Sequence, residues 1–146
     1  MKITQEADYA LRVTSVLAVS DAPMGAPRVA EAVHIPPRFA MKIFRKLSQK
    51  GIVRSVRGVN GGYCLALPAD KLTLRQVIEA IDGEIAIRHC LCDQHPCSHN
   101  PDKSLCRFHN VFMYLNSVIA ERFDRLTLAD MTNGEISIDR LINKIK

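Results

Sequence analysis

The first part of the chain spaces its apolar residues as an amphipathic helix does. Thr4 is placed to cap this helix, and Glu6 and Asp8 lie in its first turn, where acidic side chains complement the helix dipole. The pattern continues to about Ser20. The apolar side is made by Leu11, Val13, Val16 and Leu17.

Two shorter helical patterns follow a loop at residues 21–26. Pro27 suits the first turn of a helix over Arg28–Val33. The Ile35-Pro36-Pro37 sequence then ends that helix and opens a third one, which runs to Lys50. A short helix, a turn and a second short helix are typical of a helix-turn-helix.

The third predicted helix has two chemically different sides. At 100° per residue its apolar side is made by Phe39, Ala40, Ile43 and Leu47. The opposite side carries Arg38, Lys42, Arg45 and Gln49. A helix with an apolar back and a basic, hydrogen-bonding front is suited to lie on an anionic surface.

A hairpin pattern comes next. Ile52–Arg57 and Tyr63–Leu67 have the composition of short strands, and Asn60-Gly61 between them predicts a tight turn because both residues tolerate positive φ. The glycines of residues 58–62 have neither dinucleotide-binding nor Walker spacing. A basic hairpin directly after a helix-turn-helix predicts the wing of a winged helix.

Two further helices are predicted on either side of a loop. Thr73 and Gln76 form a capping box for a fourth helix that ends at Asp82. A long helix then spans about Ser104 to Phe123. Its wide apolar stripe consists of Leu105, Phe108, Val111, Phe112, Leu115, Val118 and Ile119. A stripe this wide is either buried in the core or paired with the same helix of a second chain.

Charge is distributed unevenly along the chain. Residues 1–70 contain ten Lys and Arg against five Asp and Glu, whereas residues 71–146 contain ten of each. Between Ala32 and Ala69 there are seven basic residues and no acidic one. Because solvated surfaces usually mix charges of both signs, this stretch predicts a polyanionic partner; a basic surface without a partner is the alternative.

The composition argues against several classes of protein. A chain of 146 residues with 47% hydrophobic content can bury a core without disulfides. No segment reaches the ~18 consecutive apolar residues of a membrane span. The N-terminus has no signal-peptide pattern, so we expect a cytoplasmic protein with reduced thiols and no membrane partner. No pattern for a catalytic base or nucleotide loop accompanies the thiols, so a thiol redox enzyme is the less favoured class and we expect no enzymatic activity.

Cysteine is concentrated in one segment of the chain. Four of the five cysteines lie there with a histidine, in the order Cys90, Cys92, Cys97, Cys106 and His109. Cys106 and His109 are one helical turn apart at the start of the long helix, so both side chains can point at one site. Such ligands suit an iron–sulfur cluster or, alternatively, a zinc ion. A thiol–disulfide switch is a third interpretation, and Cys64 is expected to serve packing.

With these elements assigned, the chain resembles the Rrf2 family of winged-helix transcription regulators over roughly residues 1–131. The wing, Ser55 to Tyr63, is the strongest element of the resemblance. The others are Asp8-Tyr9-Ala10-Leu11-Arg12, Lys46-Leu47 with Gly51-Ile52-Val53, Val77 to Ile81, the cysteine loop, and Leu126-Thr127-Leu128.

The resemblance implies a homodimer whose long helices cross, so that two winged helices face successive major grooves of a palindromic operator in double-stranded DNA. It also implies an iron–sulfur cluster held by three loop cysteines and a variable fourth ligand. The ligands implied for this chain are Cys92 or Cys90, Cys97, Cys106, and either His109 or Asp8 of the partner subunit. A [2Fe–2S] cluster is favoured over a [4Fe–4S] cluster, although the cysteine spacing differs from the more even spacing common in the family.

The predicted DNA-facing side chains come from the second and third helices and the wing. They are Arg28, Arg38, Lys42, Arg45, Arg54, Arg57, Asn60, Gly61 and Gly62. We expect Arg28 to contact the DNA backbone, the third-helix residues to contact bases or phosphates, and Arg57 to enter a minor groove.

The expected fold is mostly α with a small β-hairpin: a winged helix-turn-helix plus a long C-terminal dimerisation helix. We expect a DNA-binding domain at residues 1–82, a cysteine-bearing loop at 83–103, a dimerisation helix and C-terminal turn at 104–131, and a tail at 132–146. The expected function is that of a transcription regulator, of the repressor kind, whose cluster senses redox state, nitric oxide or iron–sulfur status.

Overall fold

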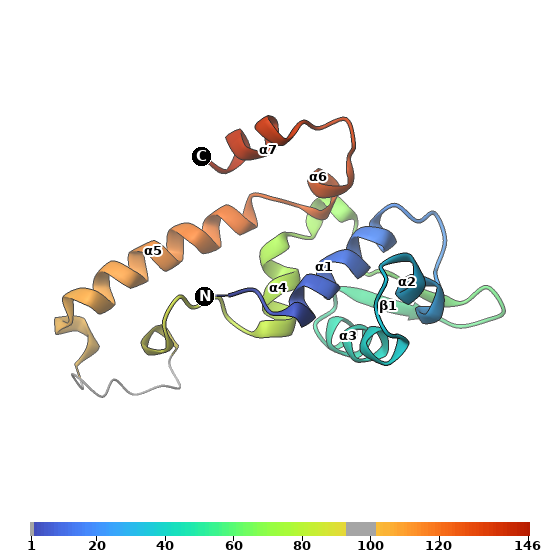
Figure 1. The fold of residues 1–146 in the computed structure, drawn as a ribbon, viewed down its shortest axis with the longest axis horizontal. Helices are drawn as coiled ribbons and strands as arrows, with labels where there is room; N and C mark the ends of the chain where they lie inside the picture. Colours follow the sequence, from blue (N-terminus) through green and yellow to red (C-terminus); the bar gives the residue numbers. More distant parts are fainter. Residues whose placement is uncertain (1, 93–101) are drawn as a thin grey trace.

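The computed structural model describes residues 2–92 and 102–146. The helices and strands, in chain order, are α1 (Gln5–Ala18), α2 (Ala26–Ala32), α3 (Pro37–Gln49), β1 (Val53–Val56), β2 (Gly62–Leu65), α4 (Leu74–Asp82), α5 (Arg107–Asp124), α6 (Leu128–Thr132) and α7 (Ile138–Ile145). Figure 1 shows α1 to α4 and the hairpin gathered in one body, from which α5 projects on the side away from the hairpin. The expected mostly helical winged-helix fold is confirmed.

The helix-turn-helix forms where the sequence predicts it. Thr4 caps α1 by accepting a hydrogen bond from the Ala7 N–H at 3.2 Å. The helix α2 begins one residue before Pro27, at Ala26. The turn to α3 passes through His34, whose φ of 55° lies in the left-handed region that few non-glycine residues adopt. These local signals place each helix end within a few residues of the prediction.

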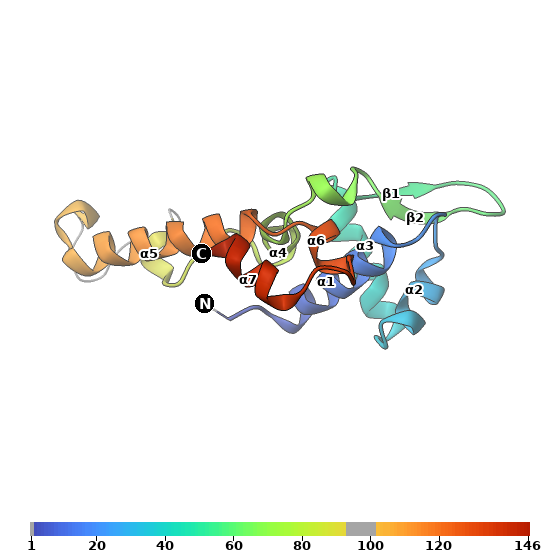
Figure 2. The ribbon, with the colours of Figure 1, turned by 90° about the horizontal axis from the view of Figure 1, so that it is seen from above.

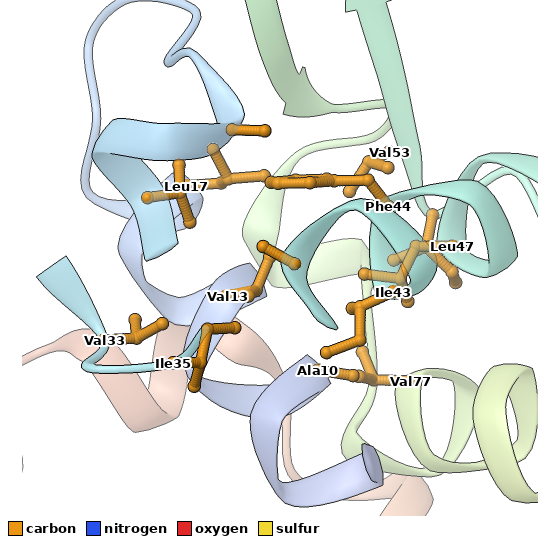
Figure 3. Close-up of a cluster of buried hydrophobic side chains, with 14 of the residues drawn as sticks. Ala10, Val13, Leu17, Val33, Ile35, Ile43, Phe44, Leu47, Val53 and Val77 are labelled. Atoms are coloured by element: carbon orange, nitrogen blue, oxygen red, sulfur yellow. The ribbon is translucent and has the colours of Figure 1, made fainter. Parts of the chain in front are cut away.

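The hydrophobic core lies between α1, α3 and α4, with α2 closing one side (Figure 3). Ala40, Ile43, Phe44 and Leu47 of α3 are all completely buried in it. The expectation that Phe39 belongs to the buried side is wrong, because this ring is 38% exposed at the margin of that side. There it packs edge-to-face with the Tyr9 ring, with the two ring centroids 6.3 Å apart. Phe44 occupies the buried position instead.

The wing is a two-stranded antiparallel hairpin in which Val53 pairs with Leu65 and Val56 pairs with Gly62. The aromatic rings of Phe44 and Tyr63 stack at 4.0 Å with an interplanar angle of 11°, which fastens the hairpin to α3. Tyr63 also exchanges backbone hydrogen bonds of 2.9 and 2.8 Å with Met24, so the segment before α2 pairs with β2 as well.

The hairpin turn falls where the sequence predicts it, at about residues 58–62, but Asn60 and Gly61 do not adopt the positive φ that we expected. The strands end at Val56 and Gly62, and Gly58 adopts a φ of 121° while Asn60 has an ordinary negative φ. Gly61 is required for another reason, since a Cβ on it would lie 2.3 Å from the Val56 carbonyl oxygen. The Gly61 N–H also donates to the Gly58 carbonyl at 2.9 Å, and this hydrogen bond closes the turn.

The chain returns to the winged body after α5. Thr73 and Thr127 form an antiparallel bridge, in which the Leu74 N–H donates to Leu126 at 2.9 Å and the Leu128 N–H donates to Leu72 at 2.8 Å. Both threonines head capping boxes, as predicted for Thr73. Leu128 is completely buried and belongs to the same core as α1 and α3.

The helix α5 presents two different sides. Ala120 is buried against the body, and Arg75 of α4 binds Asp124 at 2.9 Å near the C-terminal end. The opposite side leaves much of the predicted apolar stripe exposed, with Phe108 at 74% and Val111 at 57%. In the single chain, therefore, the stripe is not part of the core.

Candidate DNA-binding face and cysteine site

The outer side of α3 carries the predicted basic residues, and all of them face solvent. Arg38, Lys42 and Arg45 are exposed, while Ala40, Ile43 and Phe44 between them are buried in the core. The sequence analysis did not include Met41 and Ser48 in the DNA-facing set, although both are exposed on the same side of α3. The 100° periodicity that selected Arg38 and Arg45 would have selected them too.

Glu6 of α1 holds two lysines of α3. Its Oε2 lies 3.2 Å from the Lys42 Nζ and its Oε1 lies 3.0 Å from the Lys46 Nζ. Lys46 also donates to the Ile81 carbonyl of α4 at 3.4 Å, so it joins three helices. Burial raises the pKa of the Glu6 carboxyl, but its ion pairs with Lys46 and Lys42 outweigh that effect and hold its pKa below the ordinary value.

The remaining predicted DNA-facing residues lie on α2 and on the wing. Arg28, Arg54 and Arg57 are exposed. Figure 2 shows the hairpin extending past α3 and α2 at one end of the molecule, opposite to α5. Asn60 is exposed in its turn, whereas a Cβ on Gly62 would lie 2.5 Å from the Met24 backbone, so this glycine has a structural role in the hairpin.

Cys106 and His109 occupy the start of α5. Cys106 is the N-cap residue, a half-buried free thiol, and His109 lies in the first turn of the helix. The Nδ1 atom of His109 is buried and has no hydrogen-bond partner among the described residues. A buried ring nitrogen with an open lone pair or proton, one turn from a thiol at a helix N-terminus, fits the donor chemistry of a metal or iron–sulfur site.

Cys90 and Cys92 lie on the other arm of the loop. Cys90 is in a 3-10 turn, His89–Leu91, which packs against α5, and Cys92 follows it. Both are half-buried free thiols, and the Lys103 Nζ donates to the Cys92 carbonyl at 3.4 Å across the loop. Cys97 lies outside the described residues. Within residues 2–92 and 102–146, no three His, Cys, Asp or Glu side chains come close enough together to hold a metal ion.

Asp8, the alternative fourth ligand, forms an ion pair within α1. Its Oδ2 lies 2.7 Å from a guanidinium nitrogen of Arg12, one helical turn along. Its side chain is 47% exposed, so the carboxylate is accessible from outside the chain.

Asn116 connects the middle of α5 to the segment that precedes Cys90. Its Oδ1 accepts a hydrogen bond from the Ile87 N–H at 2.9 Å, and its Nδ2 donates to the Ile85 carbonyl at 2.8 Å. The sequence analysis missed this residue because its partners lie 31 and 29 positions away, beyond any local pattern.

Comparison with known proteins identifies the family. Residues 3–134 match the family model Rrf2, described as an iron-dependent transcriptional regulator. The chain belongs to the Rrf2 family. As a member of the Rrf2 family it is a DNA-binding transcription regulator with a winged helix, and its relatives are regulators rather than enzymes. No helix in the described part of the chain is long and apolar enough to cross a membrane.

The proteins similar to this chain have names that state different roles. The chain is 34% identical over 128 residues to a protein of Aquifex aeolicus assigned to the HTH-type transcriptional regulators, covering 87% of this chain and 88% of that one. It is 29% identical over 149 residues to the regulator IscR of Aliivibrio salmonicida, covering 99% and 82%. The structure of CymR, the global cysteine regulator of B. subtilis, has a TM-score of 0.72 at 23% identity, covering 90% and 96%.

Proposed function

We propose that this protein is a dimeric repressor whose binding to a palindromic operator is tuned by an iron–sulfur cluster on the cysteine loop. Cys92 or Cys90, with Cys97 and Cys106, would hold the cluster, and His109 or Asp8 of the partner subunit would complete it. When bound, a cluster supplies a group that redox change, nitric oxide or iron supply can alter. The observation that carries this proposal is the buried, unpartnered Nδ1 of His109 one helical turn from the Cys106 thiol.

The exposed surface of α3 and the wing supports the mode of DNA binding. Arg38 and Arg45 project from a helix whose opposite side is locked in the core, so α3 can lie in a major groove as a rigid unit. Arg57 precedes the exposed tip of the wing, where it can reach the adjacent minor groove or phosphates.

The exposed stripe on α5 supports a homodimer. Phe108, Val111 and Leu115 are exposed at 74%, 57% and 44% in one chain, and a second copy of the same helix would cover them. A dimer through α5 holds both winged bodies at a fixed separation, which a palindromic operator requires.

One anaerobic preparation tests the cluster. We expect coloured protein with iron and sulfide in stoichiometric amounts, and a duplex selected from random-sequence DNA that binds the loaded and metal-free forms with different affinity. Cys106→Ser should lose the colour, whereas the matched control Cys64→Ser, a half-buried wing thiol outside the loop, should keep it. Colourless protein with one zinc per chain would overturn the cluster and leave the DNA-binding role in place.

DNA contact through α3 is tested separately. Arg45→Ala should weaken binding to the selected duplex by about fivefold or more, since a contact to a base edge or phosphate is worth roughly 1–3 kcal/mol. Arg140→Ala on α7 removes the same charge from the far part of the chain and should leave the affinity unchanged. Equal losses in the two variants would argue against α3 as the reading helix.

A thiol-based regulator is the second candidate. The free, half-buried thiols of Cys90, Cys92 and Cys106 favour it, and so does the likeness of the fold to a cysteine regulator. In that case a peroxide would oxidise two loop thiols to a disulfide and be reduced to water. Reversible loss of two titratable thiols from metal-free protein, with a matching change in DNA affinity, would support it over the cluster.

A further inference from the structure

The segment between α4 and Cys90 is held at both of its ends by polar side chains. The Ile85 N–H donates to Glu79 Oε1 of α4 at 3.3 Å, and the Ile85 carbonyl accepts from Asn116 Nδ2 of α5 at 2.8 Å. The next bond joins Asn116 Oδ1 to the Ile87 N–H at 2.9 Å. Asn116 therefore binds this segment through a donor and an acceptor at once, as a neighbouring strand would.

A second set of contacts, the ion pairs of Arg75, joins α4 to α5. Arg75 binds Glu79 at 3.0 Å and Asp124 at 2.9 Å, and hydrogen bonds with Asp124 and Glu79 raise the pKa of Arg75. Ile85 itself is buried, at 4% exposure. The segment is thus bonded to α4 through Glu79, which Arg75 holds in place, and to α5 through the amide of Asn116.

Asn116 lies on the same side of α5 as the candidate ligands of the other loop arm. His109 is three positions after Cys106 and Asn116 is seven positions after His109, which places all three within an arc of about 80° at 100° per residue. His109 and Asn116 are two turns apart, about 10 Å along the axis. One side of α5 therefore holds both arms of the cysteine loop.

We propose that Asn116 is the positioning residue that couples the cysteine loop to α5. This inference rests on the proposed function, and it adds the route by which a change in the loop reaches the dimer helix. A change that moves Cys90 or Cys92 pulls on residues 85–87, and the two Asn116 hydrogen bonds pass that displacement to α5 near its middle. Without them, the loop arm keeps only the packing of His89–Leu91 against α5 and can shift more independently of that helix.

Three variants of the full-length chain test the coupling. Asn116→Leu has nearly the same volume and removes both hydrogen bonds. Asn116→Asp keeps the acceptor for the Ile87 N–H and loses the donor to Ile85. Ser117→Ala is the matched control, because Ser117 is exposed and its hydroxyl donates only to Tyr114 within α5.

The first readout is amide hydrogen exchange at Ile87 in the metal-free protein. We expect exchange at least about tenfold faster in Asn116→Leu, a smaller increase in Asn116→Asp, and the wild-type rate in Ser117→Ala. Exchange at Ile87 that stays at the wild-type rate in Asn116→Leu would overturn the proposal.

The second readout is one that a merely structural role would leave unchanged. It is the ratio of affinities for the selected duplex between protein reconstituted anaerobically with Fe²⁺ and sulfide and the metal-free protein. In Asn116→Leu we expect this ratio to fall toward one, with metal-free affinity within about threefold of wild type. A wild-type ratio of one would refute the proposed function and the coupling together; a full wild-type ratio that persists in Asn116→Leu would refute the coupling alone.

Discussion

Single side chains fix the orientation of α3, the helix proposed to contact DNA. Phe44 fills the core below α3 and stacks on Tyr63, so one ring joins the helix to the wing. Glu6 acts from the other side by pairing with Lys42 and Lys46. Together, an apolar contact and an ionic one fix the angle at which Arg38 and Arg45 are presented.

We predict that Phe44→Ala lowers the free energy of unfolding by about 3–5 kcal/mol, because it leaves a cavity in the core and removes the aromatic stack. Urea unfolding followed by circular dichroism measures the loss. Phe39→Ala, at a partly exposed position, should cost within about 1 kcal/mol and serves as the control. A larger loss at Phe39 than at Phe44 would contradict the assignment of the core.

Glu6→Gln should make stability less dependent on pH in the acid range. The folded-state pKa of Glu6 is held below its ordinary value of 4.5. The carboxylate therefore stabilises the fold fully above that value, and the contribution is lost as the pH falls through the lowered folded pKa. We expect the free energy of unfolding of the wild type to exceed that of Glu6→Gln by roughly 0.5–1 kcal/mol at pH 7. Chemical denaturation from pH 7 to pH 3 should show the gap closing below 4.5; a constant gap would show that Glu6 acts through packing.

At the scale of elements, the sequence predicts most helix ends because their signals are local. Thr4, Thr73 and Gly83 each end or begin a helix where their own chemistry requires it, and Thr127 does the same at α6. Contacts between distant elements have no such signal. Periodicity alone does not reveal the ion pairs of Glu6 with α3 or the hydrogen bonds of Asn116 with residues 85–87, because both depend on how the helices pack together.

The candidate cysteine site was predictable in part for the same reason. The spacing of Cys106 and His109 sets them one turn apart wherever the helix begins, and the structure indeed begins α5 next to Cys106. The choice between Cys90 and Cys92, or between His109 and Asp8, depends on the three-dimensional path of the loop and on a second subunit, which residue spacing does not encode.

The exposed side of α5 makes a prediction at the scale of that element. Leu115→Arg places a charge in the middle of the apolar stripe and should convert the proposed dimer into a monomer, because burying an unpaired charge against a second copy costs several kcal/mol. Sedimentation velocity at micromolar concentration measures this. Ser117→Arg adds the same charge two residues along the helix and outside the stripe, so it should stay dimeric. A dimeric Leu115→Arg would show that another surface joins the subunits.

At the scale of the whole molecule, the wing with α2 and α3 lies at the end opposite to α5 (Figure 2). The wing, α2 and α3 form one end, where the excess basic charge collects. The apolar side of α5 and the start of that helix at Cys106 form the other. Under the proposed function, a change near Cys106 would reach the DNA-binding face through α5 and its contacts with α4, or through residues 83–87 directly into α4.

This arrangement predicts a steep dependence of DNA binding on salt. In the proposed dimer, each subunit would present five exposed basic side chains to the duplex: Arg28, Arg38, Arg45, Arg54 and Arg57. We expect a log–log slope between about −4 and −9, and about half that slope for the Leu115→Arg monomer. Fluorescence anisotropy between low and physiological salt measures it. A slope near zero would mean that these side chains do not meet phosphates.

The bridge between Thr73 and Thr127 has a consequence for how the molecule can be taken apart. Leu128 follows α5 in the chain and is completely buried in the core with α1 and α3. A fragment that stops before α5 would leave a cavity of leucine size there and strip the edge of residues 72–74 of its partner. We therefore expect the winged body and α5 to unfold in one cooperative transition. Removal of residues 107–146 should then destabilise the winged body even when no ligand is bound at the cysteine loop.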